Sequence, residues 1–256
     1  MLDGVQHLVT VGTKAPVSFF AYPGKPGELT PDGCSVHCLA EPEEDGRGAL
    51  AALVEALDAG KIAPAVETEQ RLPLPTGALT PEAIAQALAH LLPEHAIVMA
   101  EAATAGRPIY SALRASAPHD WLDLTGGAIG QGMPAATGAA VACPERKVIS
   151  LEADGSGMYT LQALWTQARE ELDVTTVIFS NRRYAILEME YHRVGVGAPS
   201  ERAKSLFDLS RPDLDWVQLA RGMGVDGARA TTAEEFSREL ARGLGEGGPY
   251  LIEAAL

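Results

Sequence analysis

An acidic side chain and an amide side chain each follow an apolar run of this sequence, 27 positions apart. Asp154 comes shortly after the run 147–151, and Asn181 follows the β-branched run 174–179. A helical pattern over 159–171 lies between the runs, and one helix between two parallel strands makes a right-handed crossover, which usually brings the strands close together. Because the carboxyl ends of parallel strands meet at the same edge of a sheet, we expect Asp154 and Asn181 to lie within a few ångströms of each other.

This pair of oxygen donors suits a hard divalent cation. A site with few protein ligands leaves positions for water and phosphate oxygens, which completes the octahedral shell that Mg²⁺ prefers. Gly155 lets a ligand approach the backbone, and the Ser156 hydroxyl can bond a phosphate oxygen at the start of the next helix. An Asp-Gly-Ser triplet alone is more often a turn and a helix cap. Its spacing from Asn181 favours the metal site.

Strands and helices alternate over the part of the chain that carries these residues. Thr80-Pro81-Glu82 predicts the start of a helix, because it offers a hydroxyl cap, a proline at the first helical position and an acid near the positive end of the helix dipole. The alternation predicts an α/β fold with a doubly wound, mostly parallel sheet and helices on both faces. Further predicted strands cover 96–100, 147–151, 174–179 and 250–253, and further helices cover 133–142, 159–171 and, from a capping box, 232–244.

The first sixty residues read as the end of an earlier domain. Apolar runs at 7–11 and 16–20 predict two buried strands, and the spacing over 48–59 predicts an amphipathic helix. Prolines then predict an extended linker. We therefore expect a remnant of a preceding α/β domain over 1–62, a linker over 63–79 and the main domain over 80–256.

The composition excludes several classes of partner. The 256 residues include 20 basic and 34 acidic ones, with a net charge of −14 and a pI near 4.8. Such a chain repels phosphate backbones and anionic lipid, so we expect no nucleic-acid partner and no membrane partner. Three cysteines are too few for a disulfide framework, and the first residues lack the basic charge of a signal peptide, so we expect a cytoplasmic protein. The longest uncharged run, 124–144, contains too many glycines and prolines to span a bilayer.

Cys34, His37 and Cys38 place three side chains that can bind metal within five residues. A structural zinc site needs a fourth ligand, and no second cluster supplies one. We therefore expect a strand or a turn with small buried thiols rather than a zinc site.

The segment 152–187 resembles the thiamine-diphosphate binding motif, in which Gly-Asp-Gly-Ser precedes Asn-Asn by about 27 residues. The similarity continues through 159–166, which is typical of the decarboxylase and acetolactate-synthase branch. The resemblance implies thiamine diphosphate and Mg²⁺ as cofactors, with Asp154, the Asn181 side chain and the backbone carbonyl of Arg183 as metal ligands.

Two positions depart from the motif. Ala153 stands where the first glycine is usual, which is a small-for-small change compatible with a tight turn. Ser180 replaces the first asparagine, which is not the metal ligand. Neither change removes a ligand.

A glycine-rich loop over 126–134 adds to the resemblance. Its order, G-x-x-G-x-G, differs from the dinucleotide fingerprint G-x-G-x-x-G, and by itself such a loop is as often a turn before a close-packed helix. It resembles the loop that holds the pyrimidine ring of the cofactor, slightly more in its acetolactate-synthase form. The resemblance implies that Ile129 wedges between the two cofactor rings and brings the 4′-amino group against the thiazolium C2. Backbone groups of Gly127 and Ile129 would bond the pyrimidine edge.

The resemblance also implies contacts with the diphosphate from two further loops. In the loop 101–106 the matching hydroxyl is Thr104, whereas Glu101 could equally be a solvated loop acid. After the metal motif, backbone amides would approach the diphosphate. The implied cofactor-binding residues are Thr104, Gly127, Ile129, Gly155, Ser156, Tyr184, Ala185 and Ile186.

The resemblance covers residues 9–256 and does not include the family's N-terminal pyrimidine-binding domain. That domain supplies the glutamate that protonates N1′ of the pyrimidine, so we expect no activating glutamate in this chain and little activity without a partner. The expected partners are a 2-oxo acid substrate and either a second copy of the chain or a partner chain that carries the missing domain. The implied chemistry is addition to the carbonyl of a 2-oxo acid and loss of CO₂, as a decarboxylation or as an acetolactate-synthase-like carboligation.

Two other functions remain open. A non-catalytic cofactor-binding or scaffold chain would keep the fold and bind the cofactor. A nucleotide-dependent oxidoreductase on a Rossmann sheet would need a G-x-G-x-x-G turn after the first strand and an acid about 20 residues later, and neither is present.

Overall fold

The chain forms two compact units in the computed structural model, which describes residues 2–64 and 72–256. Of the described residues, the larger unit contains 72–189 and 199–256, and the smaller unit contains 2–64 and 190–198. Residues 65–71 of the predicted linker lie outside the described residues.

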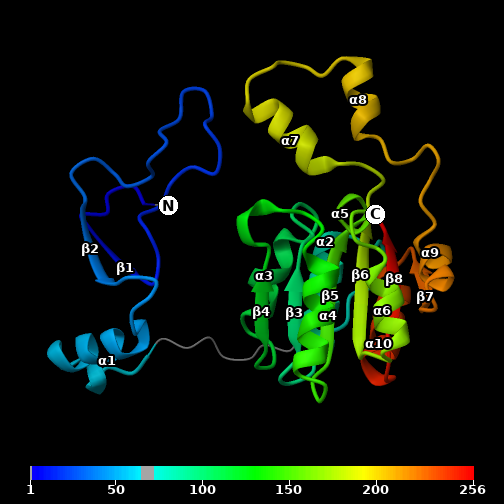
Figure 1. The fold of residues 1–256 in the computed structure, drawn as a ribbon, viewed down its shortest axis with the longest axis horizontal. Coiled ribbons are helices and arrows are strands. Elements are labelled where there is room, and N and C mark those ends of the chain that lie inside the picture. Colours follow the sequence, from blue (N-terminus) through cyan, green and yellow to red (C-terminus); the bar gives the residue numbers. More distant parts are fainter. Residues whose placement is uncertain (1, 65–71) are drawn as a thin grey trace. The chain divides into compact units, whose positions relative to one another are not determined.

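The larger unit is built on one sheet of six parallel strands. In sheet order these are β4 (Asp120–Asp123), β3 (Ile97–Ala100), β5 (Val148–Ala153), β6 (Val174–Ser180), β8 (Tyr250–Ala255) and β7 (Asp226–Ala230), as Figure 1 shows. Every neighbouring pair is parallel. The chain steps from β3 to β4 on one side and continues from β5 on the other side, so the strand order reverses between β3 and β5. This is the doubly wound α/β sheet that the sequence predicts.

Helices cover both faces of this sheet. One layer consists of α2 (Pro81–Leu91), α3 (Arg107–Leu113) and α10 (Ala233–Gly245). The other layer consists of α4 (Gly132–Ala142), α6 (Ala163–Arg169) and α9 (Trp216–Gly222). Helices α4 and α6 lie in front of the sheet in Figure 1. The short helix α5 (Asp154–Gly157) follows β5, and α7 (Ala185–Arg193) and α8 (Glu201–Phe207) follow β6 along the chain.

Alternate residues of the central strand β6 contact the two helix layers. Val177 and Phe179 belong to the core that includes α2, α3 and α10, whereas Ile178 packs with α6 and α9. All residues of β6 are buried. Because both faces are covered, the strand needs no polar side, which explains its continuous apolar and β-branched sequence.

Both predicted helix caps are present, but one hydrogen bond of the second cap differs from the prediction. The Thr80 hydroxyl accepts the N–H of Ala83 at 3.1 Å, and the Thr232 hydroxyl accepts the N–H of Glu235 at 3.2 Å. The Glu235 carboxylate accepts hydrogen bonds from Thr231 instead of Thr232. The reciprocal bond of the predicted capping box is therefore displaced by one residue.

Several predicted elements differ from the structure: the strand over 7–11 forms but only Thr10 of it is buried, and the helix predicted over 48–59 covers Gly46–Ala56. The strand predicted over 16–20 is wrong, because Val17 makes only an isolated bridge, to Glu28. The helix predicted over 159–171 begins four residues later, at Ala163. Turns occupy 158–162, where the Thr160 hydroxyl donates to the carbonyl of Gly130 at 2.9 Å. This tertiary bond holds residues whose sequence pattern alone favours a helix.

The smaller unit contains a two-stranded parallel sheet, β1 (His7–Val11) and β2 (Ser35–Ala40), and the helix α1 (Gly46–Ala56). The prediction of buried thiols is wrong here, because Cys38 is exposed and Cys34 is partly exposed; Cys34, Cys38 and Cys143 are all free. Within residues 2–64 and 72–256, no group of three or more His, Cys, Asp or Glu side chains could hold a metal ion. No helix in those ranges has the length and apolar character needed to cross a bilayer.

We expect Leu240→Ala to lower the free energy of unfolding of the larger unit by about 2–5 kcal/mol, because this side chain of α10 is fully buried. The control, Leu206→Ala, removes the same atoms from a side chain that is 72% exposed and should change that free energy by less than about 0.5 kcal/mol. Urea unfolding followed by circular dichroism measures both. Equal effects of the two substitutions would contradict the assigned core.

Candidate metal and cofactor site

Three loops meet at the edge of the sheet where the strand order reverses. They begin directly after β3, β5 and β6, with Glu101, Asp154 and Asn181 as their first residues. Strand β5 pairs with both β3 and β6, so the three loops are neighbours. Doubly wound sheets bind their ligands beyond the carboxyl ends of the strands at such a reversal.

Asp154 connects two of these loops. Its side chain is only 1% exposed, and its carboxylate accepts the N–H of Gly155 at 2.8 Å and the N–H of Arg182. Burial raises the pKa of Asp154 to about 6, although these backbone N–H groups act in the opposite direction. Among the described residues, none of the ion pairs includes Asp154. A bound cation would supply the missing positive charge.

The other two predicted metal ligands lie beside Asp154. Asn181 accepts the N–H of Arg183 at 3.1 Å through its side-chain oxygen. The carbonyl of Arg183 accepts the N–H of Ala185 at 2.9 Å, which leaves one of its two lone pairs for another partner. All three residues line one cavity of about 30 Å³. A space of this size suits an ion or a water molecule and not a whole organic cofactor. The cavity therefore fits only the end of an organic cofactor that binds a metal ion.

The same cavity collects ten of the eleven predicted site residues. Gly127 is the exception: it lies in a 3₁₀ turn (Thr125–Gly127) and does not line the cavity. Three residues of the lining were not predicted to contact the cofactor, namely Glu101, Ala103 and Ala153. The predicted residues in the lining are Thr104, Ile129, Asp154, Gly155, Ser156, Asn181, Arg183, Tyr184, Ala185 and Ile186.

Some predicted contact groups already have partners within the chain. The Ser156 hydroxyl is 3.3 Å from a carboxyl oxygen of Glu152 and 3.2 Å from the carbonyl of Ala153, so it does not point freely toward a phosphate. The amide of Tyr184 donates to the carbonyl of Phe207 at 2.8 Å, and the amide of Ala185 donates to the carbonyl of Arg183. Of the three predicted amides, Ile186 in the first turn of α7 is therefore best placed to face an anion.

Glycine is required at position 155 because the Tyr184 side chain leaves no room for a β-carbon, and not because of its backbone angles. A β-carbon at this position would lie well inside contact distance of the Tyr184 ring. The ring therefore covers the glycine directly, and the Tyr184 pKa is raised, chiefly by burial. The close contact at Gly155 is thus with the Tyr184 ring, whereas the motif predicts a ligand against its backbone.

Glu101 is a structural component of the site that the sequence left undecided. It is 2% exposed, which corrects the alternative of a solvated loop acid. One carboxylate oxygen accepts the N–H of Gly130 and the other accepts the N–H of Gly132. These bonds fix the loop that carries Ile129 and leads into α4. The signal that could have found Glu101 is its position directly after a strand, equivalent to that of Asp154.

A second buried carboxyl group lies beside Glu101. Glu152 is 1% exposed, and its pKa is raised to about 8 by burial and by the charge of Glu101, while the hydroxyls of Ser150 and Ser156 act in the opposite direction. Glu152 is therefore largely protonated at neutral pH and can lie next to the Glu101 carboxylate. A β-carbon on Gly132 would overlap with the Glu152 carboxyl group and come within 2.7 Å of Glu101. Only glycine fits between the two acids.

Comparisons with known proteins show which family the chain is similar to. A family model described as the C-terminal TPP-binding domain of thiamine pyrophosphate enzymes matches residues 105–254. A Mycobacterium tuberculosis protein, provisionally named acetolactate synthase large subunit IlvX, is 53% identical over 256 residues, which are 100% of this chain and 49% of that protein. The benzoylformate decarboxylase of Pseudomonas aeruginosa is 31% identical over 269 residues, 99% of this chain and 49% of its own length.

The fold is similar to that of solved enzymes. The thiamine diphosphate-dependent 4-hydroxybenzoylformate decarboxylase of Rhodococcus jostii RHA1 superposes with a TM-score of 0.76 at 26% identity, over 99% of this chain and 49% of that one. The chain thus spans about half the length of the relatives it matches.

We expect Glu101→Gln to loosen the glycine loop, because an amide nitrogen cannot accept one of the two backbone N–H bonds. Loss of a hydrogen bond to a charged group costs about 1.5–3 kcal/mol, so hydrogen exchange at Gly130 or Gly132 should be at least roughly tenfold faster. Glu94→Gln, in an exposed loop, is the matched control. NMR-detected exchange measures the individual amides. Unchanged protection of both glycines would contradict this role of Glu101.

Proposed function

The chain belongs to the thiamine pyrophosphate enzymes through their C-terminal TPP-binding domain, and from that premise we propose that it is the diphosphate- and Mg²⁺-binding half of an active site for 2-oxo acids. The observation that carries the proposal is the buried Asp154 carboxylate at an ion-sized cavity between the ends of β5 and β6. A divalent cation would offset the charge of this carboxylate, where the chain itself supplies only backbone N–H groups, and would also hold a diphosphate.

The residues of the cavity fit the two ends of such a ligand. Asp154, the Asn181 side chain and the Arg183 carbonyl would hold Mg²⁺. The Thr104 hydroxyl and the N-terminal turn of α7, with Ile186, would hold the diphosphate. When bound, thiamine diphosphate supplies a nucleophilic carbon that adds to the carbonyl of a 2-oxo acid and an electron sink for the loss of CO₂.

The glycine loop would position the organic part of the cofactor. Glu101 holds the loop on both sides of Gln131, next to Ile129, so the Ile129 side chain keeps a fixed place in the lining of the cavity. A fixed apolar side chain at this position would restrict how the two cofactor rings lie. Backbone groups of Gly127 and Ile129 would bond the pyrimidine edge.

We propose that the remaining part of the active site comes from outside this chain segment. None of the predicted site residues is a glutamate that could activate the pyrimidine, and the matched relatives are about twice as long as the chain. A partner chain with a pyrimidine-binding domain would supply that group. The free cysteines support a cytoplasmic location for such an assembly.

The relatives are named acetolactate synthase or benzoylformate decarboxylase, so the proposed function includes both a synthase and a decarboxylase reaction. Release of the product after loss of CO₂ gives a decarboxylase, and transfer to a second carbonyl gives a synthase. A non-catalytic chain that binds the cofactor is the alternative. CO₂ release from a set of 2-oxo acids that includes pyruvate, assayed with the chain alone and with a partner that carries the pyrimidine-binding domain, separates such a chain from an enzyme.

We expect calorimetric titration to show that thiamine diphosphate binds with Mg²⁺ and does not bind when the metal is chelated, and that NAD does not bind. Asp154→Ala should weaken cofactor binding by at least about 100-fold, because it removes the only carboxylate among the three proposed metal ligands. Asp58→Ala, at a side chain that is 76% exposed in the smaller unit, should bind like the unaltered chain. Unchanged affinity in Asp154→Ala would remove the metal assignment.

A further inference from the structure

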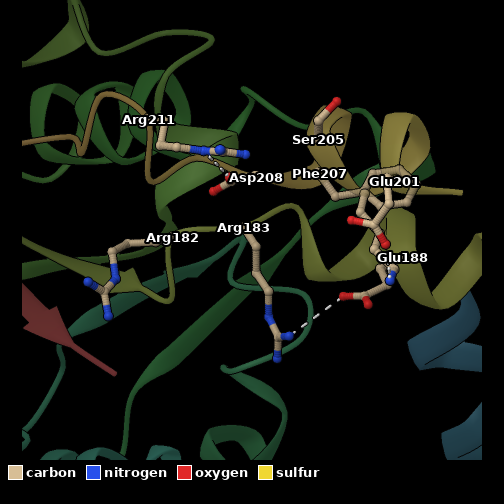
Figure 2. A pocket seen from close by; sticks show the side chains of 9 residues that line it. Arg182, Arg183, Glu188, Glu201, Ser205, Phe207, Asp208 and Arg211 are labelled. Atoms are coloured by element: carbon tan, nitrogen blue, oxygen red, sulfur yellow. Dashed lines mark hydrogen bonds and ion pairs between the residues drawn. The ribbon is translucent and has the colours of Figure 1, made fainter. Parts of the chain in front are cut away.

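A larger pocket lies next to the proposed cofactor cavity, and Arg183 lines both. This pocket has a volume of about 350 Å³ and is shown in Figure 2. Four of its nine lining residues are basic: Arg182, Arg183, Lys204 and Arg211. We call it the basic pocket.

The charge of the basic pocket is opposite to that of the chain. Three acidic residues also line it, so its side chains carry a net charge of +1, whereas the whole chain carries −14. Only 20 of the 256 residues are basic, so four in one pocket is a strong local concentration. A positive pocket in a strongly negative protein is the place where an anionic ligand is attracted and not repelled.

The carboxylates in the pocket hold its basic groups only weakly. Arg183 is 3.6 Å from Glu188, Lys204 is 2.7 Å from Glu201, and Arg211 is 2.9 Å from Asp208. The basic partners remain 60%, 55% and 78% exposed in the same order. Exposed pairs of this kind contribute little to stability because water screens them, so an entering anion can replace them without a large loss.

The backbone under the basic pocket is the backbone of the proposed metal site. Arg183 and Asp208 form an antiparallel bridge. On either side of it, the amide of Tyr184 donates to Phe207 at 2.8 Å and the amide of Leu209 donates to Arg182 at 2.9 Å. The segment 182–184 directly follows Asn181, so a ligand in the basic pocket would lie against the loop that holds the cation.

We propose that the basic pocket binds a second carboxylate on the substrate, so that the 2-oxo acid used by this enzyme is a dicarboxylic acid. This inference rests on the proposed function for the identity of the substrate. The volume is adequate for a small organic acid. Arginine side chains bind carboxylates through two parallel N–H···O bonds, and Arg182, Arg183 and Arg211 present three such groups around the space.

The test is an NMR titration of the full chain with two acids of the same carbon skeleton. In 2-oxoglutarate the distal group is a carboxylate, and in 2-oxopentanoate it is a methyl group. We expect 2-oxoglutarate to bind at least tenfold more tightly, with shifts centred on 182–184 and 204–211. The double variant Lys204→Gln/Arg211→Gln, which leaves the residues of the cofactor cavity intact, should reduce the ratio to about one. The matched control, Arg169→Gln/Arg238→Gln, removes two exposed basic groups elsewhere and should keep the preference.

Three results would overturn this assignment: equal binding of the two acids, no binding of either, or a preference that survives in the pocket variant. Inorganic phosphate that binds as tightly as 2-oxoglutarate would likewise overturn it, since the pocket would then be a general anion site. Titration of the same samples with thiamine diphosphate and Mg²⁺ distinguishes failure of the proposed function from failure of the carboxylate site. If the cofactor fails to bind while the preference for 2-oxoglutarate remains, the proposed function fails and the carboxylate site stands.

Discussion

The site depends on one buried interaction, the Asp154 carboxylate bonded to backbone N–H groups from the loops after both β5 and β6. A carboxylate is costly to bury unless its oxygens accept hydrogen bonds. Because the Asp154 carboxylate accepts N–H groups from both loops, its burial holds the two loops together. Because the donors are backbone groups, they compensate only part of the charge, and the pKa remains raised to about 6. The raised pKa marks Asp154 as the carboxylate whose charge is least compensated by the chain's own groups.

Two further acids extend this constraint across the edge of the sheet. Glu101, Glu152 and Asp154 are all nearly fully buried, in or directly after the two neighbouring strands β3 and β5. The three avoid full mutual repulsion in different ways: Glu101 accepts amides at the start of α4, Glu152 holds a proton near neutral pH, and Asp154 faces the ion-sized cavity. The loop over 126–134 and the loops after β5 and β6 are thus parts of one electrostatic arrangement.

The sequence predicted the sheet, its helices on both faces and the convergence of Asp154 and Asn181 on one cavity, because these follow from local patterns and from the rule for parallel crossovers. Asp154 and Asn181 each follow a strand, and adjacent parallel strands bring them together. Glu101 could not be assigned in this way, since its burial depends on donors about thirty residues later, at Gly130 and Gly132. The 16–20 strand failed for a similar reason: an apolar run becomes a strand only where another strand is available to pair with it.

The position of Gly132 has a consequence for how this sequence can diverge. Its α-carbon lies against two carboxyl groups, so any side chain there must displace at least one of them. Relatives with alanine or serine at this position are therefore expected to have lost the acid at 101 or at 152, and relatives that keep both acids should keep the glycine. We therefore expect positions 101, 132 and 152 to change together among relatives, although they are far apart along the chain.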